Sequence, residues 1–291
     1  MLAQIASIIA PIFLCACVGF FWGRFDKPFD SRMVTMLSLN LGIPALIFST
    51  LTKLEVPIDA FLRIGGIYFI ATLCALIFGY GFCRIFRIDP RTYVPVLAFS
   101  NAGNMGLPLS LFTFGEEGLA LGICIFVISS ICGLTIGPAI FSGRTSFDVV
   151  YRNPPIYGIL AALLFMAAGL QPPRWLANVT EILGGMSISF MIISLGVAVS
   201  RIKVQRLARG IMLSAVKLML GFALGVGIAE SFGLIGAERG VIILVCSMPV
   251  AMHNYLFAER FDRNSSEIAG MVLISTAMAY VTLPALLWFV L

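Results

Sequence analysis

Apolar residues run along the chain in ten blocks of membrane length, separated by short polar connections. A helix that crosses a bilayer needs about 20 mostly apolar residues. By that rule the expected spans cover residues 3–23, 31–52, 61–83, 92–114, 118–140, 154–171, 178–200, 208–230, 239–259 and 267–290. The connections carry nearly all of the charge and leave no room for a soluble domain. The pattern predicts an all-α polytopic membrane protein with ten transmembrane helices.

Composition leads to the same class of protein. Of the 291 residues, 60% are hydrophobic and only 11% are charged, whereas a soluble domain usually carries about 25% charge. So few ionised groups cannot cover an aqueous surface. The seven cysteines lie mostly within apolar runs without metal-like spacing, which predicts buried thiols rather than disulfides or ligands.

The basic residues predict how the chain lies across the membrane. Of 19 Lys and Arg residues, fourteen lie in loops after odd-numbered spans and four in loops after even-numbered spans. The positive-inside rule places the first set of loops in the cytoplasm. We therefore expect a protein of the inner (plasma) membrane with both termini outside the cytoplasm. The net charge of +5 reflects this topology and does not indicate nucleic-acid binding.

The longest polar connection, Gly143–Pro155, lies near the midpoint and divides the spans into five and five. Because five is odd, the second half would enter the membrane with opposite orientation, as in many secondary transporters. This predicts two inverted repeats, residues 1–143 with spans 1–5 and residues 153–291 with spans 6–10. Each half carries a proline in its fourth span, Pro108 and Pro249.

The fourth expected span contains a polar interruption. Two asparagines, two glycines and a proline fall within eleven residues: Asn101, Gly103, Asn104, Gly106 and Pro108. The proline removes one helical hydrogen bond, and the asparagine amides supply replacement donors and acceptors. Freed backbone groups persist in a membrane only inside protein or beside a water-filled cavity. The stretch therefore predicts the binding site of a transporter.

Three motifs together resemble the auxin efflux carrier family, which includes plant PIN proteins and bacterial carriers of small carboxylates. They are Asn101-x-x-Asn104-x-Gly106-x-Pro108, Asn40-Leu-Gly-Ile-Pro44-Ala-Leu-Ile-Phe48 and Pro249-Val-Ala-Met-His-Asn254-Tyr-x-x-Ala258-Glu259. The resemblance covers the whole chain. The short connection at the midpoint is similar to that of bacterial, PIN-like members.

This resemblance implies a fold similar to that of bile-acid sodium symporters, in which broken helices four and nine cross. Spans 1, 2, 6 and 7 would form a scaffold, and spans 3–5 and 8–10 would form a transport domain that moves as an elevator. Such proteins are usually homodimers through the scaffold. Asn40 and Pro44 would belong to the scaffold side that faces the site, or would form a packing kink.

The residues themselves predict a compatible site. If the second half-helix of each broken span begins at its proline, two helix N-termini point to one cavity and favour an anion. The opposing C-terminal carbonyls could hold a cation or hydrogen-bond to water. By the predicted topology, four polar side chains lie near one depth on the cytoplasmic side of the two prolines. The expected substrate-binding residues are Asn101, Asn104, Gly106, Pro108, Pro249, His253 and Asn254.

Two residues are candidates for coupling. His253 is the only histidine; it is either a hydrogen-bonded core residue or a group that titrates near neutral pH and couples protons. Lys217 lies near the middle of span eight on a stripe with Ser214, Gly221 and Gly225, so it is expected to point into the bundle. It would be either a counter-ion or coupling group, or a lysine bonded to backbone carbonyls.

The function expected from these features is secondary active transport of a small organic anion, a mono- or dicarboxylate. The sequence contains no ATP-hydrolysing motif, so a proton or sodium gradient or the membrane potential would drive it. A sodium-coupled symporter of bile-acid type and an anion-binding sensor without transport are the alternatives. A membrane enzyme would need paired carboxylates or a His-rich cluster, and no cofactor or metal is expected.

Overall fold

Helices form every regular element in residues 2–54, 58–143, 154–201 and 207–291, which are the parts of the chain that the computed structural model describes. Residues 144–153, which include Arg144 and Arg152, and residues 202–206, which include Lys203 and Arg206, lie outside these ranges. The elements are α1 (Leu2–Arg24), α2 (Ser31–Leu37), η1 (Ser38–Gly42), α3 (Ile43–Leu54), α4 (Ile58–Ile85), α5 (Pro90–Ala98), η2 (Ala102–Gly106), α6 (Leu107–Ser142), α7 (Pro154–Ala167), α8 (Arg174–Arg201), α9 (Leu207–Ser231), α10 (Gly236–Cys246), α11 (Met252–Arg260) and α12 (Ser265–Val290).

Within these residues, six helical stretches are long and apolar enough to cross a membrane. They are Ile5–Arg24, Phe61–Ile85, Ala102–Ser142, Arg174–Ser200, Leu207–Ser231 and Ser265–Val290. Helix α7 is apolar but shorter, and the expected spans two, four and nine are each divided into shorter elements. Each of the ten expected segments is helical over most of its length. The all-helical polytopic class is therefore confirmed, and ten crossings remain a prediction.

Helix α6 contains the end of expected span four and all of expected span five. Gly115 has φ 65° and ψ −151°, a conformation that interrupts the helix and that glycine alone adopts at low cost. Beyond it the chain folds back, because a Cβ placed on Gly122 would lie 3.1 Å from the Cβ of Ser110. In a straight helix these two residues would be about 18 Å apart. The sequence-based boundary at 114–118 thus falls at this turn.

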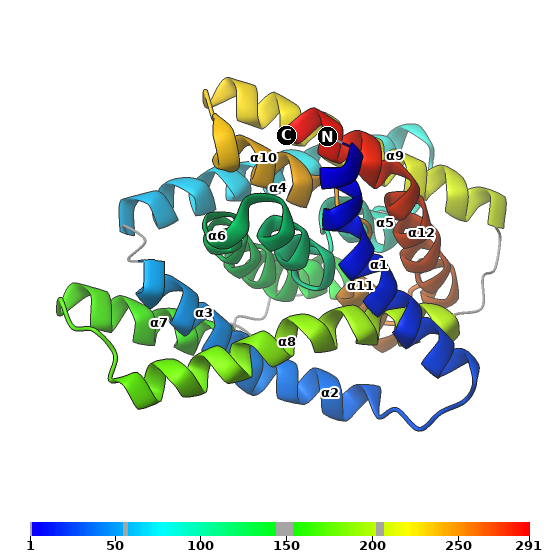
Figure 1. The fold of residues 1–291 in the computed structure, drawn as a ribbon. Helices are drawn as coiled ribbons and strands as arrows, with labels where there is room; N and C mark the ends of the chain where they lie inside the picture. Colours follow the sequence, from blue (N-terminus) through cyan, green and yellow to red (C-terminus); the bar gives the residue numbers. More distant parts are fainter. Residues whose placement is uncertain (1, 55–57, 144–153, 202–206) are drawn as a thin grey trace.

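Helices α1, α3, α7 and α8 pack closely on one another through glycines. Gly19 of α1 lies against the backbone of Ile193 in α8, and Gly196 of α8 lies against the backbone of Ala16. Gly184 of α8 approaches Leu46 of α3 in the same way, because a Cβ placed on Gly184 would lie 2.8 Å from the Leu46 Cα. Small residues let helix backbones approach closely in a membrane. Figure 1 shows α2, α3, α7 and α8 along the lower side of the molecule.

The remaining helices form a second group. Helix α4 packs on α5 and α6, and α9 packs on α10 and α12. Gly221 and Gly225 of α9 let that helix approach the end of α10, where a Cβ on Gly225 would lie 3.0 Å from the Cα of Ile243. In Figure 1, α4, α9 and α10 lie along the upper side, with α6 between the two groups.

Two short π-helical turns, η1 and η2, precede prolines in the same way. In each, a backbone N–H bonds to the carbonyl five residues earlier, from Ile43 to Ser38 and from Leu107 to Ala102. The following residue is Pro44 or Pro108, which has no N–H to continue the α-helical pattern. Both turns carry the pattern Asn-x-Gly-x-Pro. A proline at this position therefore accompanies a widened turn rather than a complete break.

Candidate functional site

The expected spans four and nine are interrupted, and their interruptions meet. Ser100 and Val250 form an isolated antiparallel β-bridge. The Asn101 N–H donates to the Pro249 carbonyl at 2.8 Å, and the Ala251 N–H donates to the Phe99 carbonyl at 3.2 Å. Two segments separated by about 150 residues thus satisfy each other's backbone groups. This pairing replaces the helical hydrogen bonds that each interruption removes.

The position of each interruption differs from the expectation that a second half-helix begins at its proline. In span nine, α11 begins at Met252, three residues after Pro249. In span four, Pro108 does lie at the start of α6, but helical backbone begins earlier, at Ala102 in η2. In span four the physical reason is that proline fits the first turn of a helix, whereas Pro249 lies in the extended segment whose carbonyl accepts the Asn101 N–H.

Four helix ends lie at the bridge. Helices α5 and α10 end there, at Ala98 and Cys246, while η2 and α11 begin there. The Asn101 side chain accepts a hydrogen bond from the Asn104 N–H at 3.2 Å and so caps η2. The Val250 N–H donates to the Ser275 Oγ of α12 at 3.1 Å. Hydroxyl and amide side chains thus bind the backbone groups that the bridge itself leaves free.

Several buried polar atoms next to the bridge have no hydrogen-bond partner among the described residues. These are the Nδ2 atom of Asn101, both side-chain amide atoms of Asn254, and the Nε2 atom of His253. Asn254 is completely buried. Buried polar atoms are normally paired, because an unpaired one costs about 1–3 kcal/mol. An arrangement of this kind can bind water or a polar ligand.

The His253 ring lies among apolar groups. Its centroid is 6.0 Å from that of Phe99 and 5.9 Å from that of Phe257. A Cβ on Gly133 of α6 would lie 2.9 Å from the His253 Nε2. The absence of a side chain at residue 133 therefore makes room for the imidazole. No described residue links His253 to Asn101 or Asn104 by a hydrogen bond.

Lys217 is buried in the bundle, only 2% exposed, in the direction that its helical stripe predicts. Its Nζ donates to the Ser100 Oγ at 2.8 Å, and that hydroxyl donates to the Cys246 carbonyl at 3.1 Å. Lys217 is thus bonded directly to the bridge. The salt bridges of the described residues do not include it. Ser100 was not among the predicted site residues, since a serine beside a polar interruption has no distinctive signal.

The glycines of η2 allow close contacts on both sides. A Cβ on Gly106 would lie 3.4 Å from the Val245 side chain of α10, and one on Gly103 would lie 3.1 Å from the Met191 side chain of α8. Asn104 between them is half-buried. Segment η2 therefore lies where the group of helices that contains α8 meets the group that contains α10.

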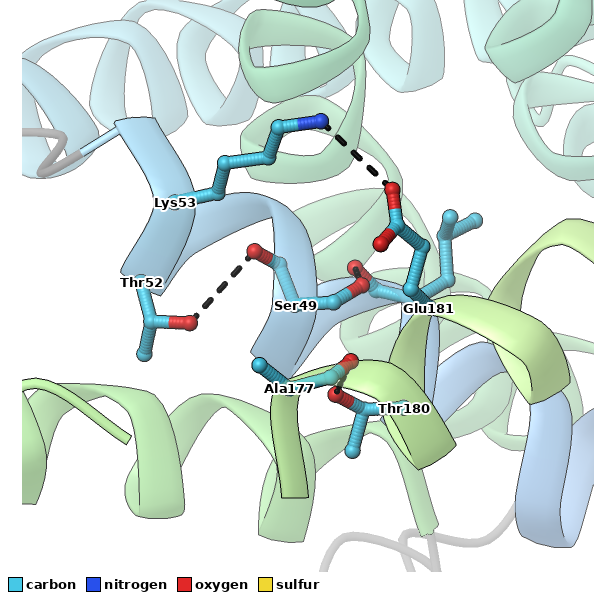
Figure 2. Close-up of polar contacts among 7 residues, drawn as sticks. Ser49, Thr52, Lys53, Ala177, Thr180 and Glu181 are labelled. Carbon is cyan, nitrogen blue, oxygen red and sulfur yellow. Dashed lines mark hydrogen bonds and ion pairs between the residues drawn. The ribbon is translucent and has the colours of Figure 1, made fainter. Parts of the chain in front are cut away.

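A cavity of 440 Å³ lies between α3, α8 and the α6 turn. Its volume is typical of small-molecule sites. Lys53 and Glu181 form a 3.6 Å ion pair at its wall, which Figure 2 shows next to Ser49 and Thr180. The polar side chains that line it are Ser49, Thr50, Thr52, Lys53, Glu116, Gln171 and Glu181. Ile188, which also lines the cavity, lies one helical turn from Met191 beside η2.

Asn40 and Pro44 lie in the other π-containing segment. Asn40 is exposed in η1, while the backbone of Pro44 lies against Gly158 of α7, where a Cβ on the glycine would come within 2.8 Å of the Pro44 Cα. The described contacts of Pro44 are thus packing contacts between α3 and α7.

In the described part of the chain, no three His, Cys, Asp or Glu side chains gather as metal ligands. The seven cysteines are free thiols.

A polytopic helical bundle with paired helix interruptions is an architecture that many secondary transporters share. A family model described as "Membrane transport protein" matches residues 5–150 and 149–287. The chain belongs to this family, which confirms the resemblance to the auxin efflux carrier family.

Two relatives share this similarity along nearly their whole length. An uncharacterized transporter of Methanothermobacter thermautotrophicus is 25% identical over 90% of this chain and 89% of its own. An uncharacterized transporter of Methanocaldococcus jannaschii is 24% identical over 98% of both chains. The family and both relatives thus place the chain among membrane transport proteins.

Proposed function

We propose that this protein is a secondary active transporter of a small organic anion and that the substrate binds at the paired helix interruptions. The observation that carries the proposal is the meeting of two helix N-termini, those of η2 and α11, beside the unpaired Nδ2 atom of Asn101 and the unpaired amide of Asn254. Helix N-termini favour negative charge. A mono- or dicarboxylate can accept hydrogen bonds from an amide while its charge faces the helix ends.

The separate packing of two helix groups supports an elevator mechanism. In this proposal α1–α3, α7 and α8 form the scaffold, and α4–α6 with α9–α12 form the transport domain. Segment η2 lies at the boundary of the two groups, in contact with Met191 of α8. A sliding motion along this boundary would carry a substrate at η2 from one side of the membrane to the other. The crossing of spans four and nine at the bridge belongs to the same proposal.

The 440 Å³ cavity between α3, α8 and the α6 turn supports a route to this site. It adjoins loops that follow even-numbered spans, which the positive-inside rule assigns to the outer side. The proposed state is therefore outward-facing. A sensor that binds the same anion without moving it is the second candidate, and it requires the same site.

Transport by reconstituted protein tests the proposal. Uptake of labelled malonate, malate, acetate and indole-acetate is measured in proteoliposomes under sodium, proton and potential gradients. We expect saturable uptake of at least one anion, which falls about tenfold or more in Asn104→Ala because a hydrogen bond to charge is lost. The matched control is Asn178→Ala, which removes an exposed amide of α8 and should change uptake less than twofold.

Each outcome separates the candidates. Anion binding without uptake by the folded wild type would favour the sensor, and uptake that does not saturate would favour a channel. Equal uptake by wild type and Asn104→Ala would show that the substrate does not bind at η2.

A further inference from the structure

We propose that Lys217 is a fixed cation that occupies the position where a coupling cation would otherwise bind, so that transport needs no sodium. The proposal rests on the proposed transport function and concerns how that site is energised. Its structural basis is the pair of helix C-termini next to the bridge, those of α5 at Ala98 and of α10 at Cys246.

The amine of Lys217 is linked to these helix ends through the Ser100 hydroxyl. Its Nζ donates to the hydroxyl of Ser100, two residues after the end of α5, and this hydroxyl donates to the carbonyl of Cys246, the last residue of α10. Leu97 and Ala98 of α5 and Cys246 line a small space together with Lys217. The lysine is thus placed where two helix C-termini converge.

The charges at this point are complementary. Each helix C-terminus carries about −0.5 of an elementary charge, so two of them offer roughly the charge that one ammonium group neutralises. In transporters with broken helices, C-terminal carbonyls of this kind coordinate the coupling cation. Here the chain supplies the cation itself, on the side chain of Lys217.

The other helices that pack against α9 present no described charge to the amine. From α4 the space is lined by Tyr68 and Thr72, and Thr72 donates to the Tyr68 carbonyl at 2.9 Å. Farther along α9, Arg209 pairs with Glu267 of α12 at 3.1 Å. The Lys217 amine therefore faces hydroxyl groups and helix ends, which are the ligands that a small hard cation takes.

The space beside the amine is small, with a volume of about 10 Å³. That is room for about one water molecule. The side chain of Lys217 fills the rest of the space between the surrounding helices. Shortening residue 217 to alanine would open a site that keeps the Ser100 hydroxyl, the Cys246 carbonyl and the partial negative charge of two helix ends. Such a site should take a small cation from solution. Methionine would fill the space without supplying a charge.

Thermal unfolding of the purified protein tests this inference without a transport substrate. Wild type, Lys217→Ala and Lys217→Met are compared in sodium, ethylammonium and choline chloride at equal ionic strength. We expect sodium or ethylammonium, relative to choline, to raise the midpoint temperature of Lys217→Ala by about 3 °C or more at concentrations near ten times the dissociation constant. The same salts should shift wild type and Lys217→Met by less than about 1 °C by the same relation.

Several results decide the matter. Recovery of folded Lys217→Ala only when ethylammonium is present during purification would support the inference. A sodium-specific stabilisation of wild type, or equal responses of Lys217→Ala and Lys217→Met, would overturn it. So would a Lys217→Ala chain that unfolds in every salt. Because unfolding requires no anion, this test stands even if the proposed transport function fails.

Uptake measurements complete the test where transport is observed. Wild-type uptake should change less than twofold when choline replaces sodium. Lys217→Ala should lose uptake in choline and regain part of it in sodium or ethylammonium, whereas Lys217→Met should stay inactive in all three. Wild-type uptake that depends on sodium would contradict a fixed cation.

Discussion

Single hydroxyl groups hold the two helix interruptions in register. Ser100 connects Lys217 to the end of α10, and Ser275 of α12 accepts the Val250 N–H of the bridge. These three bonds connect different segments, and they satisfy the Lys217 amine, the Cys246 carbonyl and the Val250 N–H at the interruptions. At the residue scale, the stability of the site depends on these two side chains.

Ser275→Ala should destabilise the protein by about 1–3 kcal/mol, because it leaves the buried Val250 N–H without an acceptor. Its neighbour Thr276 offers a matched control, since the bond described for its hydroxyl is to the Val272 carbonyl within the same helix. Thr276→Val should change stability by less than about 0.5 kcal/mol. Denaturant unfolding in detergent measures both, and equal losses would mean that Ser275 has no special role.

Proline and glycine shape the elements in two different ways. Pro44 and Pro108 follow π-helical turns with the shared Asn-x-Gly-x-Pro pattern, and both helices continue beyond them. Gly115, in contrast, reverses the chain through a backbone conformation with positive φ. At the element scale, glycine conformation produces the turn that separates expected spans four and five.

Gly115→Ala should cost about 1–3 kcal/mol, because alanine at φ 65° and ψ −151° is strained. A Cβ there meets nothing within 4 Å, so the loss would report backbone strain alone. Gly227→Ala is the control: its Cβ also meets nothing within 4 Å, but it lies inside α9. That variant should gain about 0.5–1 kcal/mol. The comparison is made by unfolding in detergent, and a tolerated Gly115→Ala would contradict the observed turn.

In the part of the chain that the structure describes, the helices pack as two groups, and η2 lies where they meet. The closest contacts of glycines with the backbone of another helix, between α1 and α8 and between α9 and α10, lie within the groups. The 440 Å³ cavity lies between the groups, next to the α6 turn. At this scale, the orientation of the chain in the membrane decides which side of the membrane the cavity faces.

That orientation predicts which exposed loops a reagent can reach from outside the cell. The variant Glu117→Cys, in the α6 turn, should react with a membrane-impermeant maleimide on intact cells. The variant Asp262→Cys, between α11 and α12, should react only after the membrane is permeabilised, because its loop carries basic residues that mark the cytoplasmic side. Both positions are exposed. The unsubstituted protein serves as the control, because its native cysteines give the background labelling. The reverse pattern would invert the topology.

The sequence by itself determined the class of protein and the approximate places of the interruptions. Hydrophobic length is a local property, so apolar blocks locate membrane helices without knowledge of their partners. Proline and asparagine act locally too, which is why the sequence pointed to residues 101–108 and 249–254. The inward direction of Lys217 followed from helical periodicity alone.

Only the tertiary structure decided which of these features come together. The bridge between Ser100 and Val250 joins segments about 150 residues apart, and no local pattern encodes their register. The same holds for the bond from Ser100 to Lys217 and for the His253 ring against Gly133. Contacts of this kind depend on how helices pack in three dimensions, and a periodic sequence pattern specifies a buried face but not the partner that covers it.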